Sequence, residues 1–286
     1  MIYAVIDIGS NSVRLMISDG EKTLNKFVQT TRLAEGMASD NMLKTVAIQR
    51  TVAAVSFFSE KAKNIGVDKL YCFATAAVRR AFNGQEFVNA VKVACKIDVD
   101  VISGETEAKI GYLGALNGRD GAIVDVGGAS TEITVVKDGA EVYTKSLDLG
   151  AVVVTDRCGQ DKNAVKEYVD DRVKEYGCVP KTKFYAIGGT ATTMASVSLE
   201  LEPYDPEKVD GFVLDKNQLS SVCDLLFSLP VSEREKLKGL QKERAKVIAS
   251  GAQILLSVME KVGVDSFTIS ESDNLEGYLK LKLEKI

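Results

Sequence analysis

Two stretches of the sequence repeat one order of residue types. Residues 4–20 read AVIDIGSNSVRLMISDG, and residues 122–139 read AIVDVGGASTEITVVKDG. Each runs from an apolar segment through an aspartate, a glycine-rich turn and a serine to an alternating segment and an Asp-Gly pair. Glycines let an anion approach the backbone N–H groups closely, and clustered N–H groups form an anion site. Ordinary hairpins also use such residues, but two matching loops favour phosphate binding.

Short side-chain donors accompany these turns, and a third glycine-rich segment follows later in the chain. Residues 186–193 read AIGGTATT, which predicts a buried strand that runs into a helix N-terminus, where free N–H groups can bind phosphate. A plain strand-to-helix turn is the competing interpretation of this third segment. The residues that we predict to bind phosphate in the three loops are Ser10, Asn11, Ser12, Gly127, Gly128, Ala129, Ser130, Gly189 and Thr190.

The composition excludes several kinds of catalytic chemistry. The 286 residues include no histidine, so Ser-His-Asp triads, phosphohistidine and His-ligated metals are impossible. A general base would be an Asp, Glu, Lys, Tyr or Cys side chain, and a metal would be a hard cation with oxygen ligands. The 5 cysteines are odd in number and show no CxxC spacing, which favours buried reduced thiols over a disulfide framework.

Charge and hydropathy limit the expected partners. The formal net charge of -4 provides no bulk basic field for nucleic acid, so a polyanion would be held by a local patch. The chain shows no secretory signal pattern and no uninterrupted apolar run long enough to span a bilayer. We therefore expect a cytoplasmic protein with neither a nucleic-acid nor a membrane partner.

The elements that must position these loops alternate between strands and helices, which predicts an α/β fold. Helices are predicted at residues 43–65, 85–95, 104–116, 160–176, 190–199, 216–229, 243–262 and 274–284. Strands beyond the repeat are predicted at residues 70–75, 97–103, 184–189 and 266–270. The segments that read as loops are residues 203–212 and the residues that follow Thr75.

The repeat also predicts the domain organisation. Each Asp-Gly pair predicts a tight hairpin turn, at residues 19–20 and 138–139. Because two related segments imply two related domains, we expect one domain of residues 1–116 with 273–286, and another of residues 117–272.

Five motifs resemble those of the Ppx/GppA family, the exopolyphosphatases and guanosine pentaphosphate phosphohydrolases of the actin and sugar-kinase superfamily. Residues 6–15 are similar to the first phosphate loop of the family, and residues 125–132, DVGGASTE, to the second. Residues 74–79, ATAAVR, resemble its arginine motif, and residues 103–108, SGETEA, its catalytic-glutamate motif. Residues 188–193 match a third loop. The resemblance spans nearly the whole chain and implies two ribonuclease-H-like domains with a cleft between them.

The resemblance also implies roles for individual side chains. It makes Glu107 the general base, although Glu105 and Glu107 would also complement a helix dipole without any catalytic role. Glu107 shares its predicted helix with Gly111 and Gly114, which leave room for a close neighbour or a ligand. Arg79 would clamp phosphate, because its planar fork matches phosphate oxygens.

Two further carboxylates, Asp125 and Glu132, are carried over from the family as catalytic. A Mg2+ ion held through water by Asp125, together with Asp7, would neutralise phosphate charge. Capping of its own loop amides is the alternative role of Asp125. Glu132 would orient water or metal, or face solvent. Arg14 would either reach phosphate or support the first loop.

The sequence departs from the family pattern at several places. Ala129 stands where a third glycine is usual, and it would be strained if the loop required a positive φ there. Val153 stands where many members carry arginine, and residues 270–277, SESDNLEG, differ from the usual SDRGLREG. Longer members append a helical domain with a His-Asp motif, which this sequence does not contain.

The reaction that these features imply is hydrolysis of a terminal phosphoanhydride. We expect a distributive exopolyphosphatase that acts on short inorganic polyphosphate with Mg2+. Guanosine pentaphosphate is the alternative substrate, and a phosphate-chain or nucleotide sensor with little turnover is the alternative class. A sugar kinase is disfavoured because Glu107 lies in a hydrolase-type motif. The expected partner is therefore polyphosphate or a phosphorylated guanine nucleotide, and a homodimer stays an open alternative.

Overall fold

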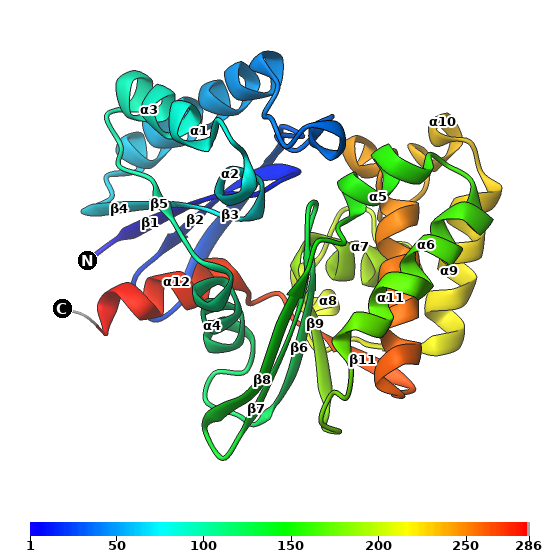
Figure 1. The fold of residues 1–286 in the computed structure, drawn as a ribbon. Helices are drawn as coiled ribbons and strands as arrows, with labels where there is room; N and C mark the ends of the chain where they lie inside the picture. Colours follow the sequence, from blue (N-terminus) through cyan, green and yellow to red (C-terminus); the bar gives the residue numbers. More distant parts are fainter. Residues whose placement is uncertain (285–286) are drawn as a thin grey trace.

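Two mixed β-sheets, each with helices on both faces, make up the computed structural model, which describes residues 1–284 (Figure 1). The first sheet has the strand order β3-β2-β1-β4-β5. Its strands are β1 (Tyr3–Ile8), β2 (Ser12–Ser18), β3 (Thr23–Thr30), β4 (Lys69–Ala74) and β5 (Asp100–Val101). Strand β1 is antiparallel to β2 and parallel to β4, so the first predicted phosphate loop, between β1 and β2, lies at the carboxyl end of β1.

The helices of the first half cover its sheet on two sides. One face packs against α1 (Thr45–Ile65), α2 (Ala76–Arg80) and α3 (Gly84–Cys95), and the other packs against α12 (Asn274–Leu283) (Figure 1). The apolar contact with α12 joins Val5, Met16 and Phe73 of the sheet to Leu275 and Tyr278 of the helix. The last helix of the described chain thus belongs to the core of the first half.

The second sheet has the order β10-β11-β9-β6-β7-β8. Its strands are β6 (Gly121–Val126), β7 (Thr131–Lys137), β8 (Ala140–Leu147), β9 (Phe184–Ile187), β10 (Val213–Asp215) and β11 (Ser266–Ile269). The helices on one side of the second sheet are α5 (Ala151–Cys158), α6 (Lys162–Arg172), α7 (Gly188–Ser198), α9 (Lys216–Ser228) and α11 (Ile248–Val262) (Figure 1). The remaining short elements are α8 (Pro206–Val209), α10 (Val231–Arg234) and 3-10 turns at Met37–Ser39, Val173–Tyr176 and Lys242–Arg244.

Helix α4 (Gly104–Ala115) connects the two halves, because it packs against α12 and against the second sheet. The two helix backbones approach closely. A Cβ atom on Gly277 would overlap the carbonyl oxygen of Ile110, and one on Gly114 would overlap the carbonyl of Asp273. The small residues predicted to leave room on α4 therefore accommodate α12.

The internal repeat is confirmed in the backbone. The N–H of Gly9 donates to the carbonyl of Ser12 at 3.0 Å, and the N–H of Gly127 donates to the carbonyl of Ser130 at 2.9 Å. Both turns join an antiparallel strand pair, and Asp138 and Gly139 form the second hairpin turn with φ of 53° and 74°. The two glycine-rich loops thus have the same internal hydrogen bond.

Several predicted elements need correction. The residues after Thr75 form the short helix α2 rather than a loop, and the strand predicted at 97–103 spans only Asp100–Val101. Helix α5 was not predicted, because the run of three valines at 152–154 is β-branched and favours a strand. The loop predicted at 203–212 contains α8, and α11 begins at Ile248 instead of residue 243.

The predicted domain boundaries, near residues 116 and 273, stay a prediction, and residues 285–286 of the first domain lie outside the described residues. Within residues 1–284, no helix is both long and apolar enough to cross a membrane.

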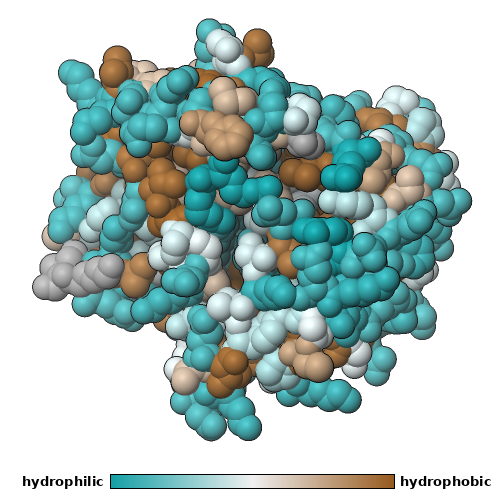
Figure 2. Space-filling view, viewed as in Figure 1, coloured by the Kyte–Doolittle hydropathy of each residue, from teal (hydrophilic) through white to brown (hydrophobic). Residues whose placement is uncertain are grey.

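All 5 cysteines are free, but Cys178 is exposed, so the expectation of buried thiols is wrong for this residue. Figure 2 shows a largely hydrophilic face, with hydrophobic side chains gathered mainly over the first half.

Candidate active site

A cavity of about 100 Å³ lies between the two halves, where the three glycine-rich loops meet. Its wall combines these loops with the N-terminus of α2, the first turn of α4 and the start of α11. The predicted site residues that line it are Asp7, Ser10, Asn11, Ser12, Glu107, Asp125, Gly127, Gly128, Ser130, Gly189 and Thr190. The predicted residues outside this wall are Arg79, Ala129 and Glu132.

Asp7 of the first loop is held by an arginine on the neighbouring strand. Arg14 lies directly across from Asp7, and its Nε and Nη2 donate to Asp7 Oδ2 at 2.9 Å and 2.5 Å. The other carboxylate oxygen, Oδ1, is buried without a hydrogen-bond partner. Burial raises the pKa of Asp7 although Arg14 acts to lower it. Arg14 holds Asp7 of the first loop and also lines the cavity. Its position therefore fits both predicted roles, which are support of the loop and contact with phosphate.

Arg14 also pairs with Asp273, which the sequence did not single out. Asp273 caps α12, because its Oδ1 accepts from the N–H of Leu275 at 3.0 Å and its own N–H donates to Glu276 Oε2 at 3.0 Å. Burial acts to raise the pKa of Asp273, but Arg14 and Lys26 outweigh it and hold that pKa below its usual value.

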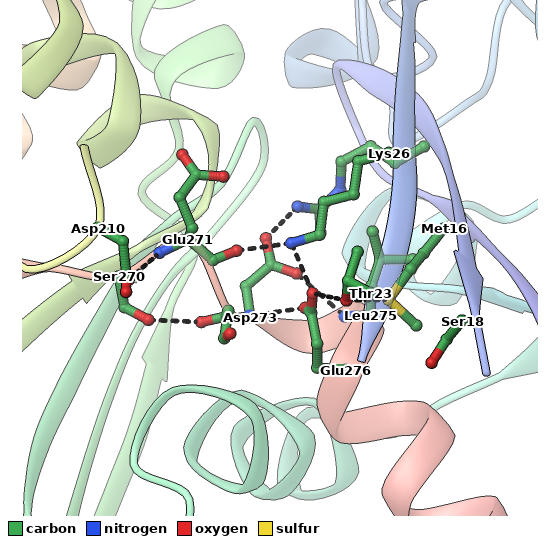
Figure 3. Close-up of polar contacts among 12 residues, drawn as sticks. Met16, Ser18, Thr23, Lys26, Asp210, Ser270, Glu271, Asp273, Leu275 and Glu276 are labelled. Atoms are coloured by element: carbon green, nitrogen blue, oxygen red, sulfur yellow. Dashed lines mark hydrogen bonds and ion pairs between the residues drawn. The ribbon is translucent and has the colours of Figure 1, made fainter. Parts of the chain in front are cut away.

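Strand β3 fixes this cap from the first half (Figure 3). Lys26 Nζ pairs with Glu276 Oε1 at 2.7 Å and donates to the carbonyl of Glu271 at 2.6 Å. Thr23 Oγ1 donates to the same Glu276 oxygen at 2.8 Å. The segment between β11 and α12 is therefore bound to β3, and Asp273 is placed where Arg14 can reach it.

Asp125 of the second loop has a different environment. Its Oδ2 accepts a hydrogen bond from Asn274 Nδ2 at 3.1 Å. Within residues 1–284, the Asp125 carboxylate therefore bonds to a side chain of α12 and does not cap the amides of its own loop. Gly188 lies beside the other oxygen with φ of 78°, and a Cβ there would stand 2.6 Å from Asp125 Oδ1. Burial first, and Asp273 second, raise the pKa of Asp125 to about 7.

Glu107 lies in the first turn of α4, a turn that the Ser103 hydroxyl caps by accepting from the N–H of Thr106 at 3.1 Å. The side chain is only 7% exposed and faces the cavity. Arg79 Nη1 donates to Glu107 Oε2 at 2.7 Å. Burial raises the pKa of Glu107, while Arg79 opposes that rise. A carboxylate in such a position can accept a proton from a water molecule in the cavity.

Arg79 lies next to Glu107. The same Nη1 that contacts Glu107 donates to the carbonyl of Ile102 at 2.9 Å. Arg79 therefore contacts Glu107, which lines the cavity, without lining the cavity itself. Its role as a phosphate clamp stays a prediction.

Arg244 lines the cavity instead, a position that sequence reasoning missed. Its guanidinium covers the N-terminus of α7 so closely that a Cβ on Gly189 would overlap it. Arg244 Nε donates to Gln241 Oε1 at 2.9 Å, and burial lowers the pKa of Arg244 to about 10, which leaves it cationic at neutral pH. The only sequence signal was indirect, because a glycine at 189 leaves space for a large side chain.

A sequence profile described as the Ppx/GppA phosphatase family matches residues 5–285. The chain belongs to the Ppx/GppA phosphatase family. A bifunctional 3-dehydroquinate synthase/phosphatase of Fusobacterium nucleatum is 30% identical over 96% of this chain and 46% of its own length. This chain thus spans about half the length of that curated relative.

Solved structures agree with this membership. The Aquifex aeolicus Ppx/GppA family member is 30% identical, with a TM-score of 0.80 over 100% of this chain and 98% of its own. An exopolyphosphatase-like protein is 25% identical, with a TM-score of 0.92 over 100% of this chain and 99% of its own. The fold is therefore the predicted α/β type, with two mixed sheets and a cavity between the two halves. The ribonuclease-H-like character of the two predicted domains, and their place in the actin and sugar-kinase superfamily, stay predictions.

Two residues of the second Ppx/GppA loop lie differently from expectation. Ala129 is buried and is absent from the described residues with positive φ, so the strain hypothesis is wrong. Glu132 is also buried and accepts from Ser146 Oγ at 2.6 Å, so it does not face solvent. Burial, with Glu107 and Asp125 nearby, raises the pKa of Glu132 well above its usual value.

The acidic residues of this Ppx/GppA site fit a magnesium ion only in part. Among residues 1–284, no group of three or more Asp, Glu, Cys or His side chains is placed to hold a metal. Mg2+ commonly uses one or two carboxylates and takes its other oxygens from water and substrate phosphate. Asp125 and the unpartnered Oδ1 of Asp7 meet that requirement, so Mg2+ binding at these two residues stays our prediction.

Proposed function

We propose that this family member hydrolyses the terminal phosphoanhydride bond of a phosphate chain, with short inorganic polyphosphate as its preferred substrate. One observation carries the proposal, namely that Glu107 faces a small cavity bounded by two glycine-rich loops with the same internal backbone hydrogen bond. Its volume of about 100 Å³ is smaller than a typical pocket for a drug-sized ligand. A terminal phosphate fits this space, and a nucleoside attached to the far end of a phosphate chain would have to lie outside it.

The residues of the chain divide the reaction between them. The two loops and the N-terminal turn of α7 offer N–H groups to the terminal phosphate, and Arg244 adds a positive charge. Glu107 accepts a proton from the attacking water as the new phosphorus–oxygen bond forms. The phosphoanhydride bond breaks, and the bridging oxygen leaves on the shortened chain. A Mg2+ ion, when bound, would neutralise charge on the phosphate oxygens.

Phosphate release from a panel of substrates tests this proposal. We would measure kcat/KM with Mg2+ for tripolyphosphate, long-chain polyphosphate, guanosine pentaphosphate and a simple phosphomonoester. The proposal predicts the highest values for inorganic chains. A higher value for guanosine pentaphosphate would reassign the substrate, and binding of chains without turnover would make the protein a sensor. A phosphomonoester as the best substrate would overturn the proposal.

The pattern of products tests the distributive part of the proposal. A gel of long-chain polyphosphate during partial digestion should show the whole population becoming gradually shorter. Full-length chains that persist beside free phosphate, with no intermediate lengths, would show processive attack.

A further inference from the structure

A second cavity, of about 260 Å³, lies directly beside the second phosphate loop. Ala129 forms part of its wall, while the neighbouring Gly128 and Ser130 line the catalytic cavity. Both halves of the protein contribute to it, since Arg80 comes from α2 and Arg157 from α5. The second cavity therefore shares one loop with the catalytic cavity and spans the same gap between the halves.

The wall of the second cavity is strongly basic. It carries three arginines, Arg80, Arg157 and Arg172, and one carboxylate, Asp148. The wall thus has a net positive charge, although the whole chain has a formal charge of -4. Like charges gathered at one place repel one another, so such a cluster is best stabilised by a bound anion.

The arginines keep donors that the protein does not use. Arg172 pairs with Glu175, but its Nε is buried without a hydrogen-bond partner. Arg157 lies over the ring of Tyr168, 4.8 Å from its centroid, and makes no ion pair within the described residues. Stacking on an aromatic ring fixes the plane of a guanidinium and leaves its N–H edge free for phosphate oxygens.

Arg80 connects this cluster to the catalytic loop. Its Nη2 pairs with Asp148 at 2.9 Å, and its Nη1 donates to the carbonyl of Ala129 at 3.3 Å. An anion that binds Arg80 would therefore also affect the position of the second-loop backbone, because Arg80 is hydrogen-bonded to Ala129.

We propose that the second cavity is an anion site for oligophosphate, occupied by phosphates of the substrate chain that lie beyond the catalytic cavity. This inference rests on the proposed function. It adds the place where the part of the phosphate chain beyond the reacting end binds. A free phosphate or pyrophosphate has the same chemistry and could come from the products, so the experiment separates the two sources.

The test compares long and short substrates in the double variant R157M/R172M. Arg80 is left intact because it holds Ala129. We expect the ratio of KM for long-chain polyphosphate to KM for tripolyphosphate to rise about tenfold or more, since each charge-assisted contact contributes a large factor. High salt should reduce this difference. The single variant Arg157→Gln, at an exposed position, gives the same test if the double variant folds poorly.

The control is Arg119→Met, which removes one positive charge from an exposed position outside both cavities. In R157M/R172M, an unchanged KM ratio together with weaker inhibition by inorganic phosphate would overturn the distal-substrate assignment in favour of a separate product anion. In the same variant, an unchanged KM ratio with unchanged inhibition by phosphate would overturn the anion site altogether.

Calorimetry keeps this inference distinct from the proposed function. If the wild-type protein hydrolysed none of the chains, the proposed function would fail. Titration of polyphosphate into wild type and R157M/R172M would still show whether these arginines bind it. Equal affinity for the two proteins would reject the site.

Discussion

The two predicted phosphate loops have the same backbone turn but different residue types across the adjacent strand pair. Asp7 on β1 faces Arg14 on β2, whereas Asp125 on β6 faces Glu132 on β7 in the equivalent register. Arg14 makes two hydrogen bonds to Asp7, while Asp125 receives one from the amide of Asn274. Arg14 therefore offsets part of the charge of Asp7 through direct hydrogen bonds, whereas the hydrogen bond to Asp125 comes from a neutral amide.

This difference shows how a duplicated motif can acquire two roles. The turn supplies backbone N–H groups in both copies, because its geometry depends on small residues and one internal hydrogen bond. The residue across the strand differs between the two copies, and we predict that Asp7 anchors its loop through Arg14 while Asp125 contributes more to cation binding. Burial raises the pKa of Asp125 to about 7, with Asp273 as the second cause.

The largest effect should come from the base that faces both loops. Glu107→Gln keeps the size of the side chain but removes the proton acceptor, so kcat should fall about 10²–10⁴-fold while the phosphate chain still binds. Steady-state kinetics and calorimetry would measure the two effects. The matched control is Glu105→Gln, an exposed glutamate in the same helical turn. If Glu105→Gln abolished turnover and Glu107→Gln did not, the assignment of the base would be wrong.

The next effect concerns the aspartate of the second loop. Asp125→Asn should reduce Mg2+-dependent turnover on the order of 10²-fold, because charge neutralisation by a metal is worth several kcal/mol. Titration of Mg2+ should show weaker apparent binding. Full activity at the normal Mg2+ concentration would remove Asp125 from the predicted metal site.

The same variant predicts a pH dependence of stability in the presence of a chelator. The pKa of Asp125 is raised from 3.8 to about 7, so its protonated form favours the folded state. The stability that it contributes is full below about pH 4 and is lost as the pH rises through about 7. The melting temperature of Asp125→Asn relative to wild type should therefore increase over this range. The exposed Asp265→Asn is the control, and a constant difference would contradict the raised pKa.

A smaller effect should distinguish the two possible roles of Arg79. Burial raises the pKa of Glu107, and Arg79 opposes that rise, so Arg79→Met should raise it further. The acidic limb of the kcat profile should then move to higher pH, so the rate on the acidic side should fall relative to wild type while the rate at high pH changes less. Arg119→Met serves as the control. A large increase in KM without any movement of the profile would instead support Arg79 as a phosphate clamp.

The smallest effect should follow substitution of Glu132. Burial raises the pKa of this side chain well above its usual value, and its Oε1 accepts a hydrogen bond from Ser146 outside the cavity wall. Glu132→Gln keeps the size of the side chain and an oxygen that can accept from Ser146, so we expect kcat within about threefold of wild type. Assays at pH 7 would measure it. A loss comparable to that of Glu107→Gln would restore Glu132 to the chemistry.

The sequence predicted the loops well because each is a short, local pattern that recurs. It could not predict Arg244 or Asn274, because these residues reach the cavity only when the 3-10 turn before α11 and the start of α12 pack against distant loops. Asp273 was likewise hidden, since its importance depends on Arg14, which lies 259 positions earlier. Helix α5 was missed for a different reason, namely that tertiary packing overrides the strand preference of its valines.

The position of α12 has a consequence for the order in which the protein can be made. Its apolar residues cover Val5, Met16 and Phe73, which the ribosome releases far earlier. A nascent chain that has completed β1 to β5 therefore still exposes one apolar face of its first sheet. That face is covered, and Arg14 meets Asp273, only after the whole second sheet has been synthesised. Incomplete chains consequently lack an assembled site and are natural clients for chaperones that bind exposed apolar surface.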